Sequence, residues 1–260
     1  MTLAALLASS SEYAERISPM VNLCKRPGGE LATRPLYFFW VVDCSGSMFG
    51  EKIGTVNHAI QSTIPEMRAA ARDNPNAELL IRTLKFSSNA EWITPAPVNI
   101  EDYTWNDLTA YGLTDLGAAC NLLCEQLTMP PMTDRALPPV IVLLSDGYPT
   151  DEYKESLNRL LSMPWGKKSV RIAISIGKDA DDDVLTEFTG NRELVLQAND
   201  AVSLVKMIKW ASTAASVVSS PLSRPNNGVI LTKNDAHKGD APLVLDVNNI
   251  PADDGSNDVW

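Results

Sequence analysis

Two runs of consecutive apolar residues, at 36–42 and 140–144, most constrain the fold of this chain. A strand with one face in water alternates apolar and polar residues. These two runs do not alternate, so both faces of each strand need to be covered. Strands of this kind are typical of a parallel sheet that lies between two layers of helices. The runs therefore predict an α/β fold.

Helical patterns lie between the predicted strands. Residues 52–72 carry apolar residues at steps of three and four, which is the spacing of an amphipathic helix. Further helices are predicted at 116–127, 151–161, 184–188 and 201–211, and further strands at 78–86, 170–176 and 193–196. A short run at 91–94 is predicted to pair back as an antiparallel edge strand. This order predicts a doubly wound, mostly parallel sheet with helices on both faces and one antiparallel edge strand.

The composition divides the chain into three parts. Residues 1–34 are expected to form an N-terminal extension, 35–213 the α/β domain, and 214–260 a flexible C-terminal tail. The tail begins with a segment rich in Ser, Pro and Asn, and its end is small and acidic, a composition that does not form a packed core. Two short apolar runs inside the tail could form a hairpin or a docking segment.

The chain is strongly acidic, with 22 Lys and Arg against 32 Asp and Glu and a formal net charge of −10. A surface of this sign repels phosphate groups, so nucleic acid and anionic membranes are poor partners. No apolar run reaches the length of a membrane span, and the N-terminus lacks the basic start of a signal peptide. The four cysteines have no CxxC spacing, which is typical of buried thiols in a reducing compartment. These features favour a cytoplasmic protein.

Oxygen-bearing residues follow the first apolar run. Asp43 ends the predicted strand, and Ser45 and Ser47 come two and four residues later. Two stretches further along the chain, which contain Thr114 and Asp146, could supply more oxygen ligands. Carboxylate and hydroxyl oxygens are hard ligands of the kind that Mg²⁺ or Mn²⁺ prefers. Because ligands of open α/β sheets bind beyond the carboxyl ends of the strands, we expect these residues to meet at one edge.

Each of these residues also has a purely structural interpretation. Asp43, Ser45 and Ser47 could each cap the helix that follows them. Thr114 could cap the next helix, and Asp146 could end its strand in a turn. The metal site is favoured because all three stretches lie at a strand end or directly before a helix, where a doubly wound fold can bring them together.

Segment 43–48 resembles the Asp-x-Ser-x-Ser signature of von Willebrand factor A (VWA) domains, in which it forms the metal-ion-dependent adhesion site (MIDAS). Thr114 matches the distal threonine of that family, and Asp146 matches its second aspartate. The resemblance covers about residues 35–213. It implies a Rossmann-like VWA fold, Mg²⁺ or Mn²⁺ held by the five oxygen-bearing residues, and a partner protein whose Asp or Glu supplies the last ligand.

A narrower resemblance is to the bacterial tellurium-resistance TerY-type proteins, and it is carried by segments 56–61, 113–119 and 144–151. Such proteins tend to be associated with a protein kinase and a PP2C-type phosphatase. The resemblance therefore implies a scaffold in a stress-response or phage-defence system. The chain lacks the cysteine-rich zinc module that follows the A domain in some relatives.

Four residues beside the metal loops are candidates for a partner-binding rim: Met48, Phe49, Tyr148 and Thr150. Met48 and Phe49 form an apolar pair that would suit an interface if it is exposed, and would serve packing if it is buried. Tyr148 and Thr150 follow Asp146, where they could contact a partner or form a plain turn.

Three functions are compatible with these features. The first is a metal-dependent protein-binding module that is not an enzyme. The second is a Mg²⁺-dependent phosphohydrolase or phosphotransferase, but haloacid-dehalogenase enzymes need a second Asp where this chain has Ser45, and the chain has no phosphate-binding G-x-x-x-x-G-K-[ST] run. The third is an adaptor that binds through its C-terminal tail and does not need the metal site. Ser45 favours the first.

Overall fold

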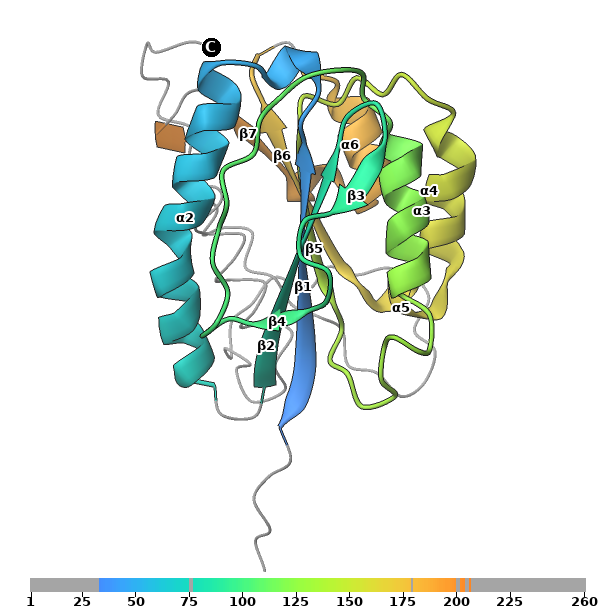
Figure 1. Ribbon diagram of the computed structural model, residues 1–260. Helices are drawn as coiled ribbons and strands as arrows, with labels where there is room; N and C mark the ends of the chain where they lie inside the picture. Colours follow the sequence, from blue (N-terminus) through green and yellow to red (C-terminus); the bar gives the residue numbers. More distant parts are fainter. Residues whose placement is uncertain (1–32, 75–76, 179, 200–201, 204–205, 207–260) are drawn as a thin grey trace, which may run out of the picture. The chain divides into compact units, whose positions relative to one another are not determined.

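The computed structural model describes residues 33–74, 77–178, 180–199, 202–203 and 206. Its centre is a seven-stranded sheet with the order β3-β2-β1-β5-β6-β7, and β4 pairs with β2 beside this path (Figure 1). The strands are β1 (Arg34–Asp43), β2 (Ala77–Phe86), β3 (Ala90–Trp92), β4 (Val98–Asn99), β5 (Val140–Ser145), β6 (Val170–Ile176) and β7 (Val195–Ala198). All pairs are parallel except β2–β3 and β2–β4.

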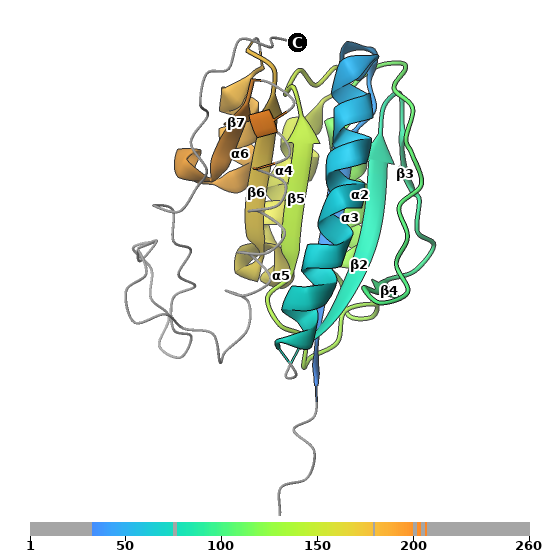
Figure 2. The same ribbon diagram turned by 90° about the vertical axis from the view of Figure 1, so that its left-hand side faces the viewer.

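Helices cover both faces of the sheet. They are α2 (Glu51–Arg72), α3 (Leu116–Gln126), α4 (Tyr153–Ser162), α5 (Pro164–Lys168) and α6 (Asp182–Thr189), with short 3₁₀ turns η1 (Gly46–Met48) and η2 (Arg192–Leu194). Figures 1 and 2 show α2 on one face of the sheet and α3, α4 and α6 on the other. The predicted doubly wound, mostly parallel fold with an antiparallel edge strand is confirmed.

The central strand β1 explains why the first apolar run does not alternate. Phe38 and Trp40 pack into the core that α2 covers, whereas Phe39 and Val41 pack into the core beneath α3, α4 and α6. All four side chains are buried. Burying an aromatic side chain stabilises the fold by roughly 1.5–3 kcal/mol, so β1 anchors both layers. Its carboxyl end is thereby held rigidly between two cores.

Several predictions about elements need correction or fall outside the described residues. Neither β4 nor α5 was predicted: β4 has two residues, and the five-residue α5 contains Pro164 and Gly166, which weaken a helical pattern. The predicted helix at 201–211 lies almost wholly outside the described residues, as do the N-terminal extension and the C-terminal tail. The three-part domain division therefore stays a prediction.

The cysteines within the described residues are buried free thiols: Cys44, Cys120 and Cys124. Burial raises the pKa of Cys44 to about 12, so this thiol stays protonated and unreactive. Within the described segments, no helix combines the length and the apolar character needed to cross a membrane.

Candidate metal centre

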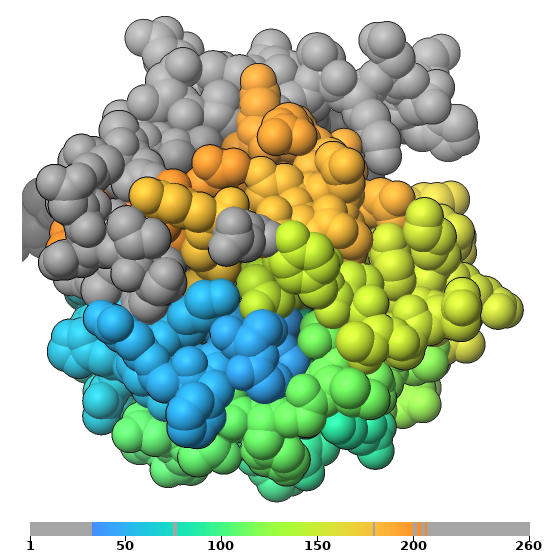
Figure 3. Space-filling model, turned by 90° about the horizontal axis from the view of Figure 1, so that it is seen from above, coloured from blue at the N-terminus to red at the C-terminus, as the bar shows by residue number. Residues whose placement is uncertain are grey.

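Three loops lie side by side at the carboxyl ends of β1 and β5. The backbone N–H of Gly46 donates to the carbonyl of Gly112 at 3.0 Å, which joins the loop after β1 to the loop before α3. The N–H of Thr150 donates to the carbonyl of Thr114 at 2.9 Å, which joins the latter loop to the one after β5. Figure 3 shows these loops in blue, green and yellow-green, meeting at the centre of this end of the sheet. The loops that carry all five predicted ligands are thus neighbours.

Asp43 lies fully buried at the end of β1. Its Oδ1 accepts the backbone N–H of Ser45 at 2.8 Å, and its Oδ2 accepts the hydroxyl of Ser145 at 2.5 Å. Burial raises the pKa of this carboxyl to about 6; the hydrogen bonds oppose the shift, and the nearby carboxylate of Asp146 adds to it. A cation placed between the two carboxylates would reverse this effect, because an opposite charge favours the ionised form.

Asp146 has a buried carboxylate oxygen that no described residue satisfies. Its side chain is buried at the end of β5, and its Oδ1 has no hydrogen-bond partner among the described residues. Its Oδ2 lies 3.6 Å from Nζ of Lys52, on the first turn of α2. A buried carboxylate oxygen without a partner costs free energy, so native structures rarely keep one without a reason. A divalent cation would satisfy it.

The three hydroxyl residues complete the donor set. Oγ of Ser45 and Oγ of Ser47 lie 3.0 Å apart; Ser45 is buried, and Ser47 is exposed. Thr114 is buried in the loop just before α3. The described residues contain no group of three or more His, Cys, Asp and Glu that could hold a metal. The donors are therefore two carboxylates and three hydroxyls, all hard oxygens, and they fit Mg²⁺ or Mn²⁺.

Gly147 and the N-terminal end of α6 hold Asp146 in position. Gly147 has a φ of +80°, and a Cβ there would lie 2.5 Å from the carbonyl oxygen of Asp181. This close approach lets the N–H of Asp181 donate to the carbonyl of Asp146 at 2.8 Å. A side chain at position 147 would push the two loops apart, so glycine is needed there to keep the carboxylate in place.

Two residues of the site were not predicted as parts of it: Lys52, which pairs with Asp146, and Asp151. Ser145 lies in the stretch that was expected to supply oxygen ligands, and its hydroxyl donates to Asp43. Asp151 was predicted in the first turn of α4, but α4 begins at Tyr153. Its carboxylate instead accepts the N–H groups of Gly117 and Ala118 at 3.1 and 3.2 Å, at the start of α3. The sequence could not show that Asp151 caps α3, because its carboxylate and the N–H groups it accepts from are more than 30 residues apart.

Replacing Asp151 by Ala is expected to lower the free energy of unfolding by about 0.5–2 kcal/mol, because two N–H groups at the start of α3 lose their acceptor. Metal affinity should fall as well, since Thr114 lies two residues before α3. Thermal unfolding and a Mg²⁺ titration would measure both effects. Replacing the exposed Asp134 by Ala is the matched control. Unchanged stability of the Asp151 variant would contradict this capping role.

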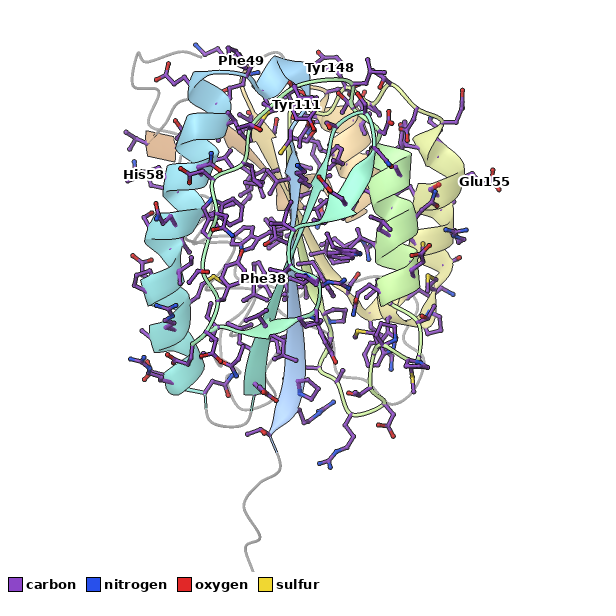
Figure 4. The ribbon with its side chains drawn as sticks, in the orientation of Figure 1. Phe38, Phe49, His58, Tyr111, Tyr148 and Glu155 are labelled. Atoms are coloured by element: carbon purple, nitrogen blue, oxygen red, sulfur yellow. The ribbon has the colours of Figure 1, made fainter. Side chains whose placement is uncertain are left out.

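The predicted rim is only partly exposed. Met48 is fully buried in the core under α2, so it is corrected from a rim residue to a packing residue. Phe49 and Tyr148 are exposed, and Figure 4 shows both at the end of the sheet where the loops with the predicted ligands lie. Thr150 is exposed too, but its Oγ1 accepts the N–H of Thr114 at 3.0 Å. Thr150 therefore also helps to position the Thr114 loop.

Comparison with known proteins gives matches in structure but not in sequence. No family model and no curated protein matches the chain. The pilus adhesin SpaC of Lactobacillus rhamnosus GG, in its open conformation, is similar with a TM-score of 0.58 and 14% identity, over 72% of this chain and 30% of the adhesin. The von Willebrand factor type A protein of Catenulispora acidiphila is similar with a TM-score of 0.52 and 14% identity, over 70% of this chain and 43% of that protein.

A third similar structure is proximal thread matrix protein 1 from the mussel byssus, in a form with a zinc-occupied MIDAS motif. Its TM-score is 0.50 and its identity 15%, over 70% of this chain and 46% of that protein. The chain spans less than half the length of each of these three proteins. At such low identity the likeness is one of fold, and the fold of this chain is that of the VWA domains.

Proposed function

We propose that this protein is a metal-dependent protein-binding module. Asp43, Ser45, Ser47, Thr114 and Asp146 would hold Mg²⁺ or Mn²⁺, and an Asp or Glu of a partner protein would complete the coordination. The bound cation would supply an electropositive centre for that carboxylate. The observation that carries the proposal is the buried Oδ1 of Asp146, which lacks a hydrogen-bond partner among the described residues. The zinc-occupied MIDAS motif of the mussel protein supports a divalent cation on this fold.

The arrangement of Asp43 favours binding over catalysis. A phosphatase of the haloacid-dehalogenase type would use a strand-end aspartate as its nucleophile, with a free oxygen facing the substrate. Here both oxygens of Asp43 accept hydrogen bonds, from Ser45 and from Ser145, and the side chain is fully buried. Asp43 is thus better suited to hold a cation and its loop than to attack a phosphate. We therefore propose a protein that is not an enzyme.

The cellular setting of the proposal rests on the resemblance to TerY-type proteins alone. In this setting the protein would be a cytoplasmic scaffold in a bacterial stress-response or defence system, and its partners would include a protein kinase and a PP2C-type phosphatase. Mixing the full chain with a purified kinase and phosphatase of this kind, with Mg²⁺ and with EDTA, would test it. Absence of a metal-dependent complex would remove this setting and leave the binding module itself untouched.

The binding module is tested with Mn²⁺ and acetate, the simplest carboxylate probe. Inner-sphere binding of acetate to protein-bound Mn²⁺ is expected to broaden the acetate methyl proton signal, because the unpaired electrons relax nearby protons. Asp43→Ala should abolish this broadening. Ser47→Ala should weaken it, and the exposed side chain of Ser47 makes a folding defect a poor explanation.

Asp102→Ala is the control, since Asp102 is an exposed aspartate between β4 and α3. It should behave like the wild type. Metal-free thermal unfolding would show whether each variant is folded. Broadening that is equal in the wild type and in Asp43→Ala, or absent from both, would contradict the proposed function.

A further inference from the structure

The exposed large apolar side chains are concentrated around the candidate metal centre. Six such side chains occur among the described residues: Phe49, Tyr111, Leu113, Met129, Tyr148 and Val202. Four of them, which we call the apolar rim, lie on the loops that carry the predicted ligands: Phe49 at 77% exposure, Tyr111 at 59%, Leu113 at 56% and Tyr148 at 53%. Clusters of exposed apolar side chains are typical of interaction sites.

The backbone of the ligand loops holds the apolar rim in place. The N–H of Tyr111 donates to the carbonyl of Cys44 at 2.7 Å, and the N–H of Leu113 donates to Oγ of Ser88 at 3.0 Å. Between them Gly112 has a φ of +87°, so Tyr111 and Leu113 lie on a sharp bend. Figure 4 shows Phe49, Tyr111 and Tyr148 at one end of the sheet, on three different loops. A segment bound at the metal would therefore have apolar side chains near it.

The charge of the chain explains what the apolar rim would add. With a net charge of −10, the protein as a whole repels an acidic partner. A single carboxylate–metal contact would have to overcome this repulsion, which fades within about 10 Å at ordinary ionic strength. Apolar contacts are insensitive to this charge and scale with the area removed from water. With a metal bound, the site would thus combine an electropositive centre with nearby apolar side chains that could pack on an apolar partner surface.

We propose that the apolar rim selects protein segments in which one Asp or Glu is flanked by large apolar side chains. The carboxylate would reach the metal, and its apolar neighbours would pack on Phe49 and Tyr148 and on Tyr111 and Leu113. This inference rests on the proposed function and adds to it the chemistry of the partner. Aromatic side chains at the centre of interfaces commonly dominate binding, which fits the three aromatic members of the apolar rim.

A display library of short peptides with a fixed central Asp and random flanking positions tests this inference. Selection on the full chain in Mg²⁺ is expected to enrich Leu, Ile, Met, Phe, Tyr and Trp beside the Asp. Replacing those flanks by Ser in a selected peptide should weaken binding about ten-fold or more. Phe49→Ser and Tyr148→Ser should each weaken it by about ten-fold and leave the Mg²⁺ affinity unchanged.

Met129→Ser is the matched control, because Met129 is as exposed as Tyr111 but lies beyond the opposite end of α3. It should not affect peptide binding. Enrichment of the central Asp without apolar flanks would overturn the apolar-rim inference and leave the proposed function standing. Selection that is the same in Mg²⁺ and in EDTA would overturn both. Sedimentation showing self-association that Phe49→Ser abolishes would also overturn the inference, because the apolar rim would then bind a second copy of this chain.

Discussion

Replacing Asp146 by Asn is expected to abolish divalent-metal binding and to stabilise the metal-free protein. The carboxylate of Asp146 is buried, its Oδ1 lacks a hydrogen-bond partner among the described residues, and it raises the pKa of Asp43. Without metal, we expect the unsatisfied Oδ1 and the repulsion from Asp43 to outweigh the 3.6 Å ion pair that Oδ2 forms with the partly exposed Lys52. The amide keeps the size of the side chain and removes the charge. Loss of an outer-shell partner of a metal ligand already costs about 10–100-fold in affinity, so loss of a ligand should cost at least ~100-fold.

The variant should bind metal more weakly and yet unfold less easily without metal. This combination distinguishes a metal ligand from a residue that is needed only for folding. Isothermal titration with Mg²⁺ would measure the affinity, and thermal unfolding in EDTA would measure the stability, which should rise by about 1 kcal/mol. Asp102→Asn, at an exposed aspartate, should change neither quantity. If the Asp146 variant bound Mg²⁺ like the wild type, the metal centre proposed at this edge would be wrong.

Replacing Lys52 by Met is expected to tighten Mg²⁺ binding by about ten-fold. Nζ of Lys52 lies 3.6 Å from Oδ2 of Asp146, so the ammonium group occupies the neighbourhood that a metal would enter. Two positive charges a few ångströms apart repel each other by several kcal/mol before solvent screening. If about 1.4 kcal/mol of this repulsion remains, removing the lysine charge raises the Mg²⁺ affinity about ten-fold. Met keeps most of the aliphatic stem, which lies near Gly177. The variant should also unfold more easily in EDTA, because the buried carboxylate loses its nearby cation.

Lys154→Met is the control for Lys52→Met. Its Nζ lies 3.5 Å from Oε1 of Glu187, nearly the same separation, but both side chains are largely exposed, at 68% and 46%. Exposed ion pairs contribute little to stability, so neither Mg²⁺ affinity nor unfolding should change. Equal Mg²⁺ affinities of the wild type and Lys52→Met would show that the lysine does not compete with the metal.

The order of helices and strands was predictable from the sequence because it depends on local patterns. The apolar run that became β1 lacks alternation because both its faces are buried, and the steps of three and four in α2 mark the one face that packs on the sheet. The edge strand β3 and the strand–loop–helix setting of Asp43 follow from equally local features. Ser45 and Ser47 lie within four residues of Asp43, so one short loop was enough to suggest oxygen ligands.

The parts that required the tertiary structure are those decided between distant segments. Met48 and Phe49 are neighbours in sequence, yet one is buried and the other exposed, because η1 turns only Met48 toward the core under α2. Lys52 meets Asp146 only because α2 begins beside the end of β5. Asp151 caps α3 rather than its own helix. Sequence alone thus indicated the main strands of the sheet and most of its covering helices, and it suggested oxygen ligands, which stay a prediction. Only folding decided which charges face one another and which apolar side chains remain in water, because those outcomes depend on contacts between loops far apart in the chain.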